Sequence, residues 1–225
     1  KMKDYFKNFE KFITPIGYRD GMVINSPFSH LGSEKKLMMV GHNPGGVSKE
    51  SNTSIKEDWN RHMADPSFNA LDEDWDGEEG THPIQLLNTT LIENTSLNQN
   101  DILSTNVYWK RSKNSEQLNV DAILEKNCKD GFLYNLEVHQ PDCILFLGHA
   151  SADIATRWAC RSTSLKRPTP FPWGNDQLIK YKKLSFNKIG VFNTVSIPHP
   201  SRFRIGENQD RVISILEALD RNGIS

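Results

Sequence analysis

The 225-residue sequence is poor in cysteine and has no long apolar run. Its three cysteines, Cys128, Cys143 and Cys160, are widely spaced and form no C-x-x-C pair, which argues against a disulfide framework or a cysteine-held metal cluster. No stretch approaches the ~20 apolar residues of a membrane span, and the N-terminus lacks the apolar core of a signal peptide. We therefore expect a cytoplasmic protein with reduced thiols and no membrane contact, metal or cofactor.

The sequence also lacks a strong net charge, since 27 basic residues stand against 28 acidic ones. Non-specific affinity for DNA comes mainly from Lys and Arg that neutralise phosphates, so this sum argues against a nucleic-acid enzyme. The charges are, however, unevenly distributed along the chain. Acidic residues concentrate at 58–79, and basic residues gather at 110–113, 161–167 and 202–204. If the acidic stretch lies on another face, a basic cleft remains.

Helical and strand periods alternate along the chain as an α/β domain requires. Strands are predicted near 36–41, 101–107, 143–147, 177–184 and 188–195. Helices are predicted near 5–13, after Pro83, over 116–139 with a break near Gly131, over 150–159 and over 207–219. We expect one domain over residues 1–225, a three-layer α/β/α fold with a short, mainly parallel sheet and an acidic insert at about 47–80.

Two short polar segments follow predicted strands. The first consists of Gly41, His42, Asn43, Pro44, Gly45 and Gly46, and the second of His199, Pro200 and Ser201. In an open α/β sheet, ligands bind outside the carboxyl ends of the strands, so both segments should face the same cleft. Taken singly, each motif is more often a simple chain reversal.

Four motifs together carry a family resemblance. They are G-x-N-P-G at 41–45, Ser-Thr-Asn at 104–106, the apolar strand ending in Gly at 144–148, and His-Pro-Ser at 199–201. In order and spacing they resemble the uracil-DNA glycosylase superfamily over about residues 36–220, and most closely its mismatch-specific and single-strand-selective monofunctional branches. The iron–sulfur branch is set aside because its cysteines are missing. The resemblance implies a monomer that acts on single- or double-stranded DNA.

The resemblance implies a catalytic pair, Asn43 and His199. Breaking an N-glycosidic bond places negative charge on the departing pyrimidine, and a neutral imidazole at His199 can donate an N–H to it. The amide of Asn43 can hold a water but cannot take its proton strongly, which suffices if the bond breaks before water attacks. The alternative for Asn43 is a turn residue that tolerates left-handed geometry.

The base site that the resemblance implies combines residues from the first segment with Asn106. An Asn amide offers a donor and an acceptor along one edge, which matches the N3–H and O4 of uracil. The alternative is a strand-ending Asn bonded to its own loop. Two glycines after Pro44 leave space beside C5 of the base or only make a tight turn. The predicted base-binding set is Gly41, His42, Pro44, Gly45, Phe68 and Asn106.

A flipped base also needs an aromatic floor, and the insert offers Trp59, Phe68 and Trp75 without a spacing that selects one. The family places an aromatic shortly after the first motif, so Phe68 is our choice. Each of the three can instead pack the insert onto the core.

The segment after His199 is expected to form a loop that enters the minor groove, with Ser201 on a phosphate and Arg202 or Phe203 in the gap left by the base. Its alternative is a solvated pair of arginines. The predicted DNA contacts are Lys110, Arg111, Lys166, Arg167, Ser201, Arg202, Phe203 and Arg204.

The sequence therefore predicts a metal-free, monofunctional DNA glycosylase for uracil or a 5-modified pyrimidine. Neither motif contains a Lys that could form a Schiff base, so strand cleavage is not expected. A catalytically silent binder of DNA or nucleotides and a hydrolase of free nucleosides or nucleotides remain as alternatives.

Overall fold

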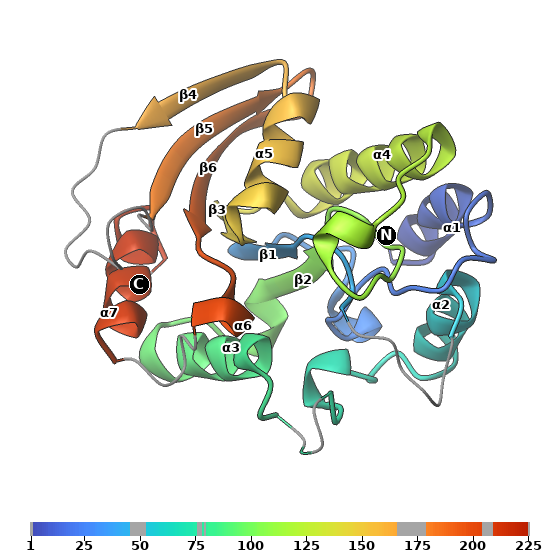
Figure 1. Cartoon of the computed structure of the whole chain (residues 1–225), viewed down its shortest axis with the longest axis horizontal. Coiled ribbons are helices and arrows are strands. Elements are labelled where there is room, and N and C mark those ends of the chain that lie inside the picture. Colours follow the sequence, from blue (N-terminus) through green and yellow to red (C-terminus); the bar gives the residue numbers. More distant parts are fainter. Residues whose placement is uncertain are drawn as a thin grey trace.

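The computed structural model describes residues 2–45, 53–75, 78, 80–165, 179–203 and 209–224. A six-stranded sheet forms its centre, in the order β2-β1-β3-β6-β5-β4 (Figure 1). The strands are β1 (Leu37–Gly41), β2 (Ile102–Asn106), β3 (Cys143–Leu147), β4 (Arg161–Leu165), β5 (Lys180–Phe186) and β6 (Gly190–Ile197). Neighbours among β2, β1, β3 and β6 run parallel, whereas β5 and β4 are antiparallel to their neighbours. The expectation of a mainly parallel α/β sheet is thus confirmed.

Helices cover both faces of the sheet. Side chains alternate along β1, so that Met38 and Val40 join one buried cluster and Leu37 and Met39 join another. The first cluster contains side chains from α1 (Met2–Ile13), α4 (Ala122–His139) and α5 (His149–Trp158). The second contains side chains from α3 (Pro83–Asn94) and α7 (Gln209–Asp220). Tyr5, Phe9 and Ile13 bury one face of α1, and Leu87 and Leu91 bury one face of α3, whereas Ile123 of α4 is exposed against expectation.

Helix α4 runs without interruption through Gly131, so the predicted break is wrong. A Cβ at this position would lie 2.3 Å from Cη2 of Trp109, which is itself buried. The glycine is therefore a point of close approach between α4 and the segment after β2, rather than a helix end.

The acidic insert contains a helix that the sequence reading missed, α2 (Ile55–Ala64). Ser54 and Glu57 form a capping box at its start, and Trp59 stacks on Phe9 of α1 with ring centroids 5.3 Å apart. The insert is thus anchored in the same core as α1. The polar edge strand β4 and the short helix α6 (Pro200–Phe203) were also missed.

Among the described residues, no helix combines the length and apolarity that a membrane span requires.

Candidate active site

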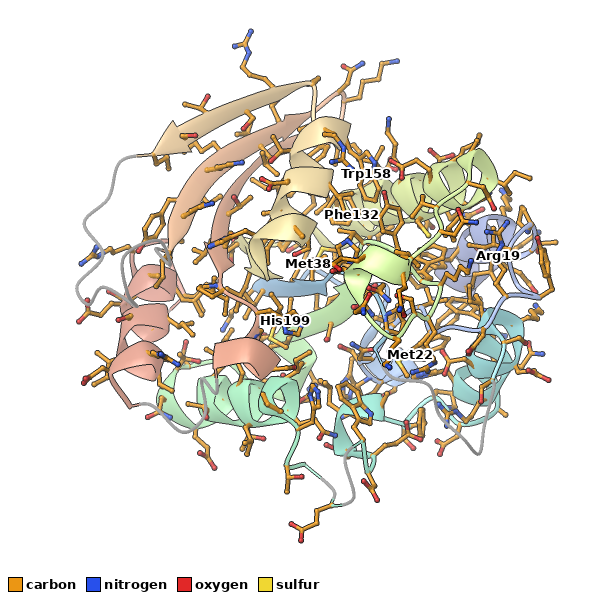
Figure 2. The ribbon with its side chains drawn as sticks, viewed as in Figure 1. Arg19, Met22, Met38, Phe132, Trp158 and His199 are labelled. Atoms are coloured by element: carbon orange, nitrogen blue, oxygen red, sulfur yellow. The ribbon has the colours of Figure 1, made fainter. Side chains whose placement is uncertain are left out.

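A cleft of about 440 Å³ opens beyond the carboxyl ends of β1, β2 and β6. Residues following these strands form one side, the motif wall, made of Asn43, Pro44, Gly45, Asn106, His199 and Ser201. The acidic insert supplies a second side, the insert wall, made of Asp58, Arg61, Glu73, Asp74 and Trp75. Met22 and His199, both labelled in Figure 2, line the same cleft although they come from distant parts of the chain. The structure therefore brings Asn43, Asn106 and His199 to one site.

A chain of hydrogen bonds fixes which way the Asn43 amide faces. The carbonyl of Asn114 can only accept, so the Ser112 hydroxyl donates to it at 2.6 Å. Oγ of Ser112 then accepts from Nδ2 of Asn43 at 2.9 Å, and the same Nδ2 donates to the Pro44 carbonyl at 2.9 Å. Oδ1 of Asn43 accepts from Nδ1 of His42 at 2.8 Å. Both amide hydrogens are thus used, and Oδ1 retains one lone pair for a water.

His42 supports Asn43 from outside the cleft. Its ring lies edge-on to Tyr108 with centroids 5.7 Å apart. The Tyr108 hydroxyl donates to Glu125, whose other oxygen accepts from Nε1 of Trp158 at 2.6 Å. Burial and the Glu125 contact raise the pKa of Tyr108, so this hydroxyl keeps its proton. His42 belongs to a rigid support and does not line the cleft.

Asn106 ends β2 at the cleft. Its residue is 8% exposed, it lines the cleft, and its side chain has no hydrogen-bond partner among the described residues. Gly41 makes this position possible, since a Cβ there would lie 2.3 Å from Oδ1 of Asn106. The amide is therefore positioned for a ligand that offers a matching donor and acceptor.

His199 follows β6 and is held by the backbone on one side of its ring. The N–H of Ser201 donates to Nδ1 at 3.3 Å, so the neutral imidazole carries its proton on Nε2. Gly148, with φ of 103°, lies against the ring: a Cβ there would be 3.5 Å from Cδ2. In its neutral form, His199 is thus expected to carry the ring N–H on Nε2.

The insert wall is built around an Asp58–Arg61 pair. Nη2 of Arg61 lies 3.0 Å from Oδ1 of Asp58, and Nη1 lies 2.9 Å from Oε1 of Glu73. The guanidinium also sits 4.1 Å from the ring centroid of Phe68. Burial raises the pKa of Asp58 to about 6, although Arg61 acts in the opposite direction. Three contacts thus fix the position of Arg61 beside the cleft.

The aromatic floor differs from our expectation. Phe68 does not line the cleft, because it packs edge-on against buried His62 and beneath Arg61. Trp59 is 2% exposed in the core. Trp75 lines the cleft and contacts His82 edge-on, so Trp75 replaces Phe68 as the aromatic beside the ligand space.

The residues predicted to contact DNA differ in their position relative to the cleft. Arg111 lines the cleft, but its guanidinium donates to the Gly45 carbonyl at 2.6 Å and pairs with Asp20, so it braces the first motif. Lys110 contacts the Asn119 carbonyl and does not line the cleft. Ser201 lies on the cleft at the start of α6, where a loop was expected. Gly46, Lys166, Arg167 and Arg204 lie outside the described residues, as do the side chains of Arg202 and Phe203.

A basic cleft would have required the acidic residues at 58–79 to lie on another face of the molecule, and this requirement is not met. Asp58, Glu73 and Asp74 line the same cleft as the motif wall. Sequence reasoning also missed Asn25, which lines the cleft, is 6% exposed and donates to Oγ of Ser104 at 3.2 Å. No motif signalled it, because a segment before β1 folds against β2 to place it there.

Across the part of the chain that the structure describes, no group of three or more His, Cys, Asp or Glu side chains is arranged to hold a metal ion. Comparisons with protein-family models and with curated proteins give no match to this chain. The function must therefore be argued from the cleft itself.

Proposed function

We propose that this protein is a monofunctional DNA glycosylase of the uracil-DNA glycosylase type. It would take a flipped uracil or 5-modified pyrimidine into the cleft and hydrolyse its bond to deoxyribose, leaving an abasic site. The observation that carries the proposal is that Asn106, whose amide makes no hydrogen bond among the described residues, lines the same cleft as Asn43 and His199. A pyrimidine edge supplies the donor and acceptor that this amide lacks.

The proposed reaction uses the two catalytic side chains at different moments. As the C1′–N1 bond breaks, its electron pair goes to the pyrimidine, and the Nε2–H of His199 donates to the oxygen where negative charge grows. The water held by Oδ1 of Asn43 adds to C1′ and then loses its proton to solvent. Both hydrogens of the Asn43 amide are already used, so only Oδ1 is left for this water; an amide oxygen orients the water and is too weak a base to deprotonate it.

Strand cleavage is not part of the proposal. A lyase step needs an amine that attacks C1′, and no lysine is among the described residues that line the cleft. The product is expected to be an intact strand with an abasic site, which breaks only after alkali.

The acidic insert wall favours hydrolysis of free nucleosides as a second candidate. Carboxylates in the cleft repel DNA phosphates, whereas they accept hydrogen bonds from the hydroxyls of a free sugar. A free nucleoside has no flanking phosphates to be repelled.

One assay separates the two candidates. The protein is incubated with single- and double-stranded oligonucleotides that carry uracil, thymine or 5-substituted cytosine, and in parallel with the matching nucleosides. Alkali-dependent strand breaks together with released base support the glycosylase. Base release from nucleosides alone supports the second candidate.

A further inference from the structure

We propose that the insert wall binds a sugar-sized, polyhydroxylated substituent at C5 of the flipped pyrimidine. The inference rests on the proposed function, because it specifies the base that the same cleft would take.

The cleft is larger than a bare pyrimidine requires. Its volume of about 440 Å³ falls in the range of ~300–1,000 Å³ that holds drug-sized ligands, which is more than one bare pyrimidine fills. Among the described residues, none lies within 4 Å of a Cβ at Gly45, so none of them closes the motif wall at this point. The base therefore has room to carry a large group.

The cleft also offers hydrogen-bond donors and acceptors that the described residues do not use. Arg61 has five N–H groups, of which Asp58 and Glu73 take two, and its side chain is 40% exposed. In the same cleft, Oδ1 of Asn25 has no hydrogen-bond partner among the described residues, although the residue is 94% buried. This unpaired acceptor is independent of the carboxylates and calls for a ligand donor.

The balance of charge selects the ligand class. An anionic substituent would meet the carboxylates of Asp58, Glu73 and Asp74, and a cationic one would meet the guanidinium of Arg61. A neutral polyol avoids both conflicts, because each hydroxyl donates to a carboxylate or amide oxygen and accepts from an N–H. Trp75 adds an aromatic surface in the same wall, against which the C–H face of a sugar can pack.

The test compares bases that differ only at C5. Oligonucleotides carry cytosine or uracil with a hydrogen, a methyl, a hydroxymethyl or a glucosylated hydroxymethyl group at that position. We expect the single-turnover excision rate to be highest for the glucosylated base and to exceed that of the methylated base by about 10²-fold, because a site that bonds substrate hydroxyls rejects analogues without them.

Variants of the insert wall locate the effect. Asp58→Asn and Trp75→Ala are each expected to lower the glucosyl-to-methyl rate ratio by about 10-fold. Asn60→Ala is the control, since Asn60 is exposed on the same helix and does not line the cleft. Circular dichroism melts verify folding, and the wild-type ratio itself tests the inference if a variant fails to fold.

A binding measurement separates this inference from the proposed function. Fluorescence anisotropy is recorded with the same oligonucleotides carrying a 2′-fluoro sugar, which resists hydrolysis. Tighter binding of the glucosylated base without excision of any natural substrate would overturn the proposed enzyme and support the inference. Equal or weaker binding and excision of the glucosylated base, or a ratio unchanged in both insert variants, would overturn the inference.

Discussion

Gly41 and Asn106 approach so closely at the ends of β1 and β2 that a Cβ on residue 41 would lie 2.3 Å from Oδ1 of Asn106. The glycine of the first motif therefore shapes the candidate site although it does not line the cleft.

Gly41→Ala is expected to displace the Asn106 amide and lower kcat/KM for excision by about 10²-fold, since polar contacts to the base then lose their geometry. Gly45→Ala is the comparison, because its Cβ meets no atom of the described residues within 4 Å. Single-turnover kinetics with melting curves provide the measurement. Equal effects of the two substitutions would contradict this role of Gly41.

Ser112→Ala is expected to release the Asn43 amide, because the hydroxyl that accepts from Nδ2 is lost. We expect kcat to fall by about 10-fold with KM nearly unchanged, as one hydrogen bond to the water-holding group is removed. Ser112→Thr keeps the hydroxyl and should retain activity. The assignment of Ser112 as a positioning residue fails if the alanine variant matches the wild type.

Gly45→Tyr is expected to fill the open side of the motif wall. A phenol ring there should exclude C5 substituents, narrowing the enzyme to plain uracil or inactivating it. Competition between uracil and 5-substituted bases in one reaction gives the ratio directly. Unaltered use of 5-substituted bases in this variant would show that the space lies elsewhere.

Stability is expected to decrease as the pH falls from about 6.5 to 4. Burial lowers the pKa of His62 and of His139 to about 4, so unfolding takes up two protons in this range. Asp58 has the opposite effect on the pH dependence: its pKa is raised to about 6 in the folded protein, so unfolding releases one proton. For these three groups the net uptake is about one proton, which corresponds to about 1.4 kcal/mol per pH unit between pH 6 and 4. Burial also lowers the pKa of His30 and of His149, which acts in the same direction.

Chemical denaturation at several pH values measures this slope. Asp58→Asn removes the opposing group and should make the slope steeper, whereas Asp153→Asn, at an exposed position, serves as the control. A free energy of unfolding that is constant or rises as the pH falls through this range would refute the assignment.

Some features of the fold and site follow from local sequence, and others depend on contacts that no local pattern encodes. Asn43, Asn106 and His199 could be placed together because parallel strands end at one edge of a sheet. The edge strand β4 is polar and exposed, so only its pairing with β5 defines it.

The insert was the hardest part to predict. Ser54 and Glu57 do carry a helix-start signal, but nothing in the sequence says how the insert folds back. The way the insert folds back decides that Trp75, and not Phe68, lines the cleft. It also places Asp58 there. Gly131 gave a misleading signal, since a glycine that admits Trp109 has the same sequence appearance as one that ends a helix.

The most direct test of the account is single-turnover excision by His199→Ala and Asn43→Ala, with oligonucleotide binding measured in parallel. The control is His149→Ala, because His149 is a half-buried histidine that bonds Ser196 and does not line the cleft. Loss of the donor to the departing base predicts a rate lower by about 10²–10³-fold for His199→Ala, with binding retained and the control active. Excision by both site variants at the wild-type rate would contradict the account.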